Sequence, residues 1–191
     1  MQKIKEHNII LKNESDKIVI RSIKNTDLIF YKNWFRDGHI LKDAVEKVSE
    51  EEINKWISND TKRQYIFIIE FNEKPYGEIV LWNDNTLIIS GERYKKPFYN
   101  IMIKFYEKIN DSDINYILDF FIKSIKQTKI KINSLYTLID EKEEINYVEN
   151  YLKNGFKNIE KELYKTKSEK YFKKNNIENQ YEILTMLIKD V

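Results

Sequence analysis

Residues 65–83 read YIFIIEFNEKPYGEIVLWN, and this stretch decides the fold class. Two apolar runs, residues 65–71 and 76–83, flank the short polar segment 72–75. Strand-forming residues on both sides of a short polar turn are typical of a β-hairpin. We therefore expect two antiparallel strands here.

Further strands are indicated on both sides of this hairpin by β-branched and aromatic runs. They are expected at residues 17–24, 98–109, 130–139, 157–164 and 181–189. Residues 87–90 fit either a further short strand or an irregular edge. The polar stretch 165–180 predicts a loop or a short helix.

Helices are indicated where apolar residues recur at intervals of three and four. They are expected over residues 28–35, from Ser49 onward, over about 111–125 and over 143–154. Asp111 and Asp113 are expected to cap the third helix, and Gly155 is placed for a left-handed cap after the fourth. A hairpin followed by β–α–β crossovers predicts a mixed α/β (α+β) domain, with a mostly antiparallel central sheet flanked by helices.

One domain over residues 1–191 is expected, with residues 1–16 as an N-terminal extension. The chain has only 4 Gly and 2 Pro, and no linker-like stretch divides it. The absence of cysteine excludes disulfides, thiolate metal sites and a cysteine nucleophile. With only two histidines, a histidine-rich metal site is not expected, and we predict no metal.

The charge balance and the hydropathy of the chain limit the classes of partner that can be expected. Lys+Arg is 33 and Asp+Glu is 31, which gives a net charge of +2 and none of the basic excess of a duplex-binding protein. Lysines and aromatic residues cluster at 164–174, but glutamates interleave with them, so we expect no nucleic-acid partner. No apolar run reaches membrane-spanning length and the first residues do not resemble a signal peptide, which predicts a cytoplasmic protein.

The element order, together with three short motifs, resembles the GNAT superfamily of N-acetyltransferases. The motifs are the first predicted helix with Tyr31 to Phe35, the hairpin IEFNEKPYGEI at 69–79, and YLKNGF at 151–156. The likeness extends over about residues 18–189. Within the superfamily, the chain looks most like the branch that contains aminoglycoside 6'-N-acetyltransferases and protein N-terminal acetyltransferases. The resemblance implies a GNAT-like acyl-CoA N-acyltransferase fold and acetyl-CoA as co-substrate.

The resemblance also implies a set of site residues. Tyr151 falls on the family's general-acid position, although a core-packing tyrosine is the alternative. Ile101, Met102 and Ile103 fall on the strand whose backbone faces the thioester carbonyl. At the pyrophosphate end, the matching segment is 106–114, which offers Lys108, Asn110 and Ser112. This segment lacks the glycines of the family loop, and glycine lets backbone approach a phosphate closely.

The amine acceptor is expected between the first helices and the central hairpin, where Trp34, Asp37 and Trp82 are candidate contacts. Stacking and charge pairing by these residues would suit a small-molecule or peptide amine. The alternatives are that Trp34 packs in the core and that Asp37 only ends a helix. Two functions stay open: an acetyl-CoA-dependent N-acetyltransferase, and a degenerate relative that acts as a binding or scaffold module. Either a monomer or a homodimer fits the sequence.

Overall fold

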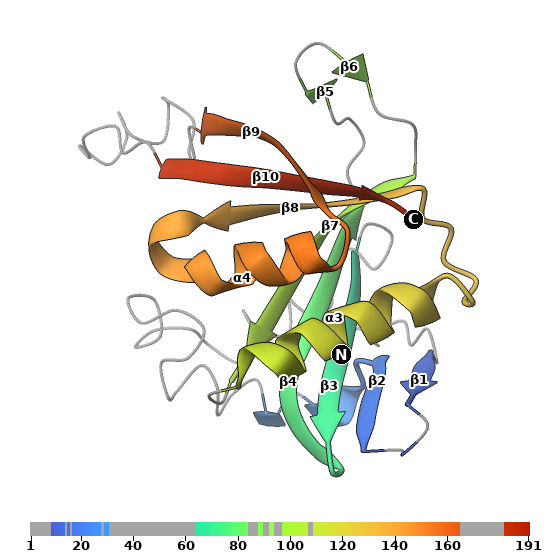
Figure 1. The fold of residues 1–191 in the computed structure, drawn as a ribbon. Coiled ribbons are helices and arrows are strands. Elements are labelled where there is room, and N and C mark those ends of the chain that lie inside the picture. The colour runs from blue at the N-terminus through green and yellow to red at the C-terminus, as the bar shows by residue number, and fades with distance from the viewer. Residues whose placement is uncertain are drawn as a thin grey trace, which may run out of the picture.

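The computed structural model describes residues 9–13, 15, 17–27, 29–30, 64–83, 88–89, 92–93, 97–106, 109–164 and 182–191 (Figure 1). These residues form an eight-stranded sheet in the order β1-β2-β3-β4-β7-β8-β10-β9. The sheet strands are β1 (Ile10–Lys12), β2 (Ile18–Ser22), β3 (Gln64–Phe71), β4 (Lys74–Asn83), β7 (Phe98–Phe105), β8 (Ser134–Asp140), β9 (Lys157–Tyr164) and β10 (Glu182–Asp190). A separate pair, β5 (Ile88–Ile89) with β6 (Glu92–Arg93), stands apart from it.

Antiparallel pairing dominates the large sheet. Within the described strands, β7 and β8 are the only parallel neighbours. They are joined by the helix α3 (Asp111–Ile125), and the helix α4 (Glu141–Lys153) connects β8 to β9. A short 3-10 turn, η1 (Asn25–Asp27), follows β2. The expected mixed α/β fold with a mostly antiparallel sheet is confirmed.

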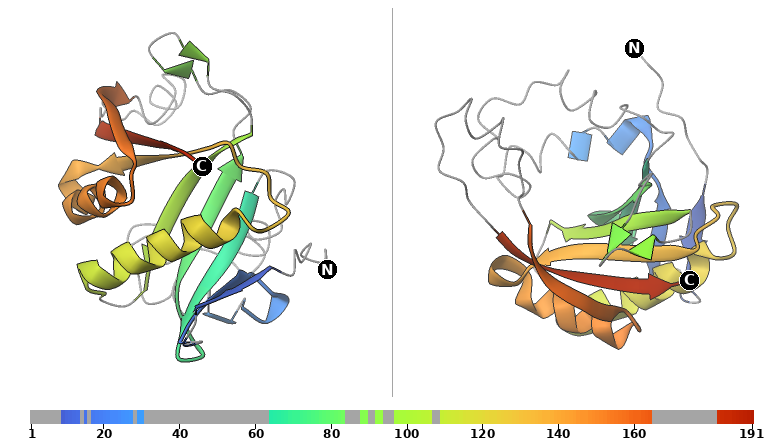
Figure 2. Two further views of the ribbon diagram at one scale, coloured as in Figure 1. Left: turned by 45° about the vertical axis from the view of Figure 1, so that its right-hand side comes forward. Right: turned by 90° about the horizontal axis from the view of Figure 1, so that it is seen from above.

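The helices α3 and α4 cover the same face of the sheet (Figure 2, right). α3 has its buried side chains on one stripe, which includes Ile117, Leu118 and Phe121. They pack on inward-facing residues of the central strands, such as Phe67 and Ile101. Phe67 and Phe121 meet edge to face, with ring centroids 5.3 Å apart. This core fixes β7 and β8 relative to the helices.

The central hairpin is confirmed, and its turn is tighter than the sequence indicated. Asn72 and Glu73 alone form it, with φ of 48° and 65°, and Pro75 already lies in β4. Gly77 is required by close packing, because a Cβ there would overlap the carbonyl oxygen of Lys104 on β7. Gly77 therefore lets β4 pack closely against β7, the strand that borders the candidate site.

Several element boundaries differ from the expectations. The strand expected at 98–109 ends at Phe105, the one expected at 130–139 begins at Ser134, and α4 begins at Glu141 rather than 143. Residues 10–12, within the presumed extension, form β1 and pair with β2. Gly155 has the expected left-handed conformation, with φ of 78°. Ile29 and Phe30 are helical, and the remainder of the first two expected helices lies outside the described residues.

Candidate functional site

A gap opens where the parallel strands β7 and β8 part. Their register runs from Phe98↔Ser134 to Asn100↔Tyr136 and stops there. Beyond Asn100 a cavity of about 80 Å³ lies between the strands. It is lined by residues 102–104 of β7, residues 137–139 of β8, and Tyr147 and Tyr151 of α4. This cavity is the candidate site.

The two strands part because each follows its outer neighbour. β7 stays paired with β4 along its length, from Asn83↔Tyr99 to Gly77↔Phe105. β8 stays paired with β10 from Ser134↔Asp190 to Asp140↔Leu184. The two pairs of strands diverge in direction, as Figure 1 shows. The inner edge of β7 beyond Asn100 thus faces the cavity instead of a neighbouring strand.

Tyr151 lies on α4 and faces this cavity, with only 3% of its surface exposed. Its ring packs edge to face against Phe156, with centroids 5.0 Å apart. The helix end beneath it is anchored twice: Asn154 Nδ2 donates to Asn115 Oδ1 on α3 at 2.7 Å, and Lys189 Nζ donates to the Asn154 carbonyl. Burial lowers the pKa of Lys189, and its ammonium stands at the end of α4, where the helix dipole favours a cation. Tyr151 is therefore held in a fixed position.

The predicted cofactor-facing residues of β7 point to both faces of the sheet. Ile101 and Ile103 are buried in the core beneath α3, and Ile103 also lines the cavity. Met102 points to the opposite face and is 39% exposed. Any role of Ile101 therefore has to be carried by its main chain.

The predicted pyrophosphate residues Asn110 and Ser112 lie at the start of α3. Asn110, not Asp111, is the N-cap: its Oδ1 accepts from the Asp113 N–H at 2.9 Å and from Ser112 Oγ at 2.5 Å. Asn110 Nδ2 also donates to Asp113 Oδ2 at 2.6 Å. The expected cap at Asp111 to Asp113 is wrong because the preceding Asn reaches the same orphan N–H group. Lys108 lies outside the described residues.

On the acceptor side, the structure places one of the three predicted contacts. Trp82 lies on β4 directly opposite Asn100 of β7, and 37% of its surface is exposed. Trp34 and Asp37 lie outside the described residues. Glu78, on the same face of β4 as Trp82, is buried, with 1% exposed.

A buried charge cluster that the sequence pattern did not predict lies beside β2. Arg21 of β2 donates to both carboxylate oxygens of Asp27, at 2.7 and 2.9 Å, and to Glu70 of β3 at 2.8 Å. The hydrogen bond to Asp27 is the main reason why the pKa of Arg21 is raised. Asp27 also accepts from the Lys24 N–H at 2.7 Å, which fixes the turn after β2. The sequence does hold one signal for this cluster, because Arg21 is a charged residue within the β-branched run at residues 17–24.

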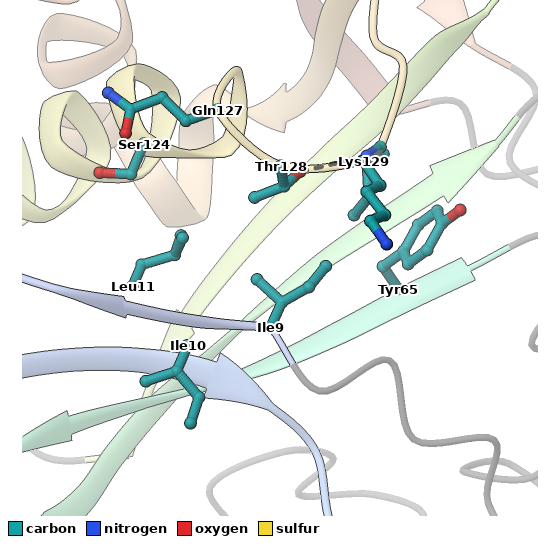
Figure 3. Close-up of a pocket in the computed structure, with 9 residues that line it drawn as sticks. Ile9, Ile10, Leu11, Tyr65, Ser124, Gln127, Thr128 and Lys129 are labelled. Atoms are coloured by element: carbon teal, nitrogen blue, oxygen red, sulfur yellow. Dashed lines mark hydrogen bonds between the residues drawn. The ribbon is translucent and has the colours of Figure 1, made fainter.

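A larger cavity, of about 680 Å³, lies away from the parted strands (Figure 3). Ile9, Ile10 and Leu11 border it on one side, and Thr128 and Lys129 after α3 border it on another. None of the predicted site residues lines it. This cavity is bordered by apolar residues of β1, whereas the cavity lined by Tyr151 is bordered by β7, β8 and α4.

No described helix combines the length and apolar character needed to cross a membrane. Within the same part of the chain, no three His, Cys, Asp or Glu side chains gather as metal ligands do.

Comparison with solved structures identifies the fold as that of GNAT acetyltransferases. An alpha-N-protein acetyltransferase of a ribosomal protein, in complex with coenzyme A, superposes with a TM-score of 0.69 at 10% identity, over 96% of this chain and 98% of the other. Spermidine N-acetyltransferase from Vibrio cholerae, in complex with coenzyme A and spermine, gives a TM-score of 0.62 at 15% identity, over 91% and 95%.

An aminoglycoside acetyltransferase in complex with coenzyme A gives a TM-score of 0.63 at 10% identity, over 91% of this chain and 94% of the other. No family model and no curated protein matches the sequence. At these identities the likeness establishes the fold, and the expected GNAT-like architecture is confirmed.

Proposed function

We propose that this chain transfers an acetyl group from acetyl-CoA to a primary amine of a small molecule or peptide. The observation that carries the proposal is the gap between β7 and β8, with Tyr151 buried at its wall. Neighbours of the same fold were solved with coenzyme A bound, and their names give protein, spermidine and aminoglycoside acceptors. These acceptors share an amine, which supports an amine acceptor here.

The residues present fit acetyl-CoA at the parted strands. The main chain of residues 101–103 borders the gap beyond the last pair with β8, so those of its polar groups that do not bond to β4 face an elongated ligand there. Met102, Ile103 and Leu138 offer apolar contact to a pantetheine arm. Backbone N–H groups of β7 would stabilise negative charge on the carbonyl oxygen during transfer.

At the phosphate end, α3 supplies a helix N-terminus. Its first N–H groups and its dipole favour an anion, as at other helix starts. Asn110 and Ser112 are proposed as phosphate contacts, with Lys108 as a nearby cation. Asp111 and Asp113 stand in the same turn and oppose an anion, so we expect weaker phosphate binding than a glycine-rich loop would give.

When bound, acetyl-CoA supplies an activated acyl carbon: an N–C bond forms and the C–S bond breaks, and an ammonium acceptor loses two protons, one to a base and one to the leaving thiolate, while one N–H stays on the amide. Tyr151 is proposed as the acid that protonates the leaving thiolate, because its hydroxyl-bearing ring lines the gap. Trp82 is proposed to contact the acceptor from β4, together with Trp34 and Asp37. The general base is not assigned.

The second candidate function is a binding or scaffold module that has lost acetyl-CoA. One observation favours it: the side chains of Asn110, Ser112 and Asp113 satisfy one another at the start of α3, in a segment without glycine. In this case the gap between β7 and β8 would be a relic of the fold.

Thermal unfolding with acetyl-CoA separates the two functions. A ligand at 100 times its Kd adds about 2.7 kcal/mol to the free energy of unfolding. We expect a clear rise in Tm at millimolar acetyl-CoA, and its loss in Thr137→Phe, because Thr137 is buried at the wall of the cavity. Phe98→Leu, in the paired half of β7, is the control and should keep the rise. Absence of a shift in the unaltered protein would remove the enzyme proposal.

A further inference from the structure

Asn100 occupies a singular position on β7. It is the last residue of β7 that pairs with β8, so it stands where the two strands part. Its neighbours Tyr99 and Ile101 belong to the core beneath α3. Because side chains alternate along a strand, Asn100 and Met102 project from the opposite face of the sheet. Asn100 thus lies at the head of the gap, on the side away from Tyr151.

The side-chain oxygen of Asn100 is buried and accepts no hydrogen bond from the residues that the structure describes. Buried acceptors are nearly always satisfied, and one that is not destabilises the folded protein. An unsatisfied acceptor beside a candidate site therefore needs an explanation. A donor brought by a ligand supplies one, because the oxygen is then paired only in the complex.

The surroundings of this oxygen indicate what kind of donor fits. Trp82 of β4 lies directly opposite Asn100, at the separation of a cross-strand pair, and Met102 follows on the same face. Both are partly exposed, at 37% and 39%, so the surface beside the oxygen is apolar and aromatic. An indole face attracts a cation, and an amide oxygen accepts its N–H. Together they fit an ammonium or amine group.

We propose that Asn100 is an acceptor-binding residue, whose Oδ1 receives an N–H of the substrate amine while Trp82 packs against the same group. This assignment rests on the proposed acetyl transfer and specifies which side of the gap the amine enters. The amine and Tyr151 then stand on opposite faces of the sheet, with the parted strands between them. Specificity for amines over alcohols follows, because an ammonium provides both the charge and the N–H donors.

The test compares two variants of near-equal size, Asn100→Leu and Asn100→Asp, in the full chain. The probes are spermidine, kanamycin and a short peptide with a free N-terminus, each with saturating acetyl-CoA. We expect Asn100→Leu to raise the KM for the amine at least about tenfold, a loss of about 1.4 kcal/mol. Its affinity for acetyl-CoA should not change, and its Tm should stay equal or rise. Asn100→Asp keeps the acceptor oxygen and should keep or lower the KM.

Asn158→Leu on β9 makes the same substitution far from the gap and should leave the KM unchanged. An unchanged KM in Asn100→Leu overturns the assignment, as does an equal loss in both variants, since the amide N–H would then be the group in use. A marked fall in Tm in Asn100→Leu would also overturn it, by revealing a structural partner. Failure of the unaltered protein to bind acetyl-CoA removes the proposed function itself, whereas binding without transfer to any of the three amines removes the amine-acceptor assignment.

Discussion

The two edges of β7 behave differently along the same residues. Toward β4, pairing is continuous from Tyr99 to Phe105, and Gly77 lets the strands approach closely. Toward β8, pairing stops at Asn100 and a cavity follows. One edge thus contributes to the stability of the sheet, while the other leaves main-chain groups facing a cavity.

This difference shows how one strand supports both folding and a candidate site. An unpaired edge is costly in a sheet unless something covers it. Here the cost is confined to about half of one strand, because the remaining half pairs on both sides. Substitutions at the paired edge should therefore change stability, and substitutions at the parted edge should change ligand binding or transfer.

The largest expected effect lies at the parted edge. Tyr151→Phe should lower kcat by about 10²- to 10⁴-fold, the usual contribution of a general acid. Unfolding should change little, because the ring and its contact with Phe156 remain. Steady-state kinetics with the best of the three amines measures this. Tyr147→Phe is the matched control, since Tyr147 lines the same cavity from the same helix. Equal losses in both variants would contradict an acid role specific to Tyr151.

The paired edge gives the next effect. Gly77→Ala should lower the free energy of unfolding by about 1–3 kcal/mol, because the added Cβ meets the Lys104 carbonyl oxygen and forces the strands apart. Urea denaturation measures this. Lys74→Ala, at the exposed start of β4, should be nearly neutral. If Gly77→Ala were equally neutral, the close approach of β4 to β7 would not contribute to stability.

The smallest effect is a pH dependence in the paired half. The pKa of Tyr99 is raised to about 12. Burial of the hydroxyl is the main cause, and the nearby Tyr65 is the second. The unfolded chain releases this proton near pH 10, so the stabilisation is complete below pH 10 and is lost between about pH 10 and 12. The unaltered protein should lose about 1–2 kcal/mol more than Tyr99→Phe over this interval. Parallel pH profiles of the two proteins would contradict it.

Turn chemistry and apolar alternation were enough to predict the central hairpin and most of the sheet. Boundaries were less certain, because apolar residues continue past strand ends. Tyr106 is buried although β7 ends at Phe105, and Ile130 is buried before β8 begins. The cap of α3 was placed one residue late, since Asn110 is followed by three further residues that can cap a helix. Strand β1 was missed because it spans three residues.

The candidate site was harder to predict than the fold. Alternation along β7 and β8 carries no information on how far the two strands stay paired, so the residue at which they part could not be predicted from the pattern. Asn100 could not be predicted as a site residue for the same reason, because a single Asn within a strand carries no pattern that distinguishes it. The Arg21 cluster depends on Glu70, which is distant in sequence. Contacts between residues so far apart in sequence can be identified only once the three-dimensional structure is known.

Strand β10 lies between β8 and β9, although it follows both along the chain. During synthesis on the ribosome, β8 therefore emerges well before the neighbour that keeps it aligned. Lys189, which closes the end of α4 beneath Tyr151, lies near the end of β10 and is made with it. Until β10 has left the exit tunnel, β8 lacks its outer neighbour and one wall of the gap is incomplete, so the candidate site should form only after β10 has been made.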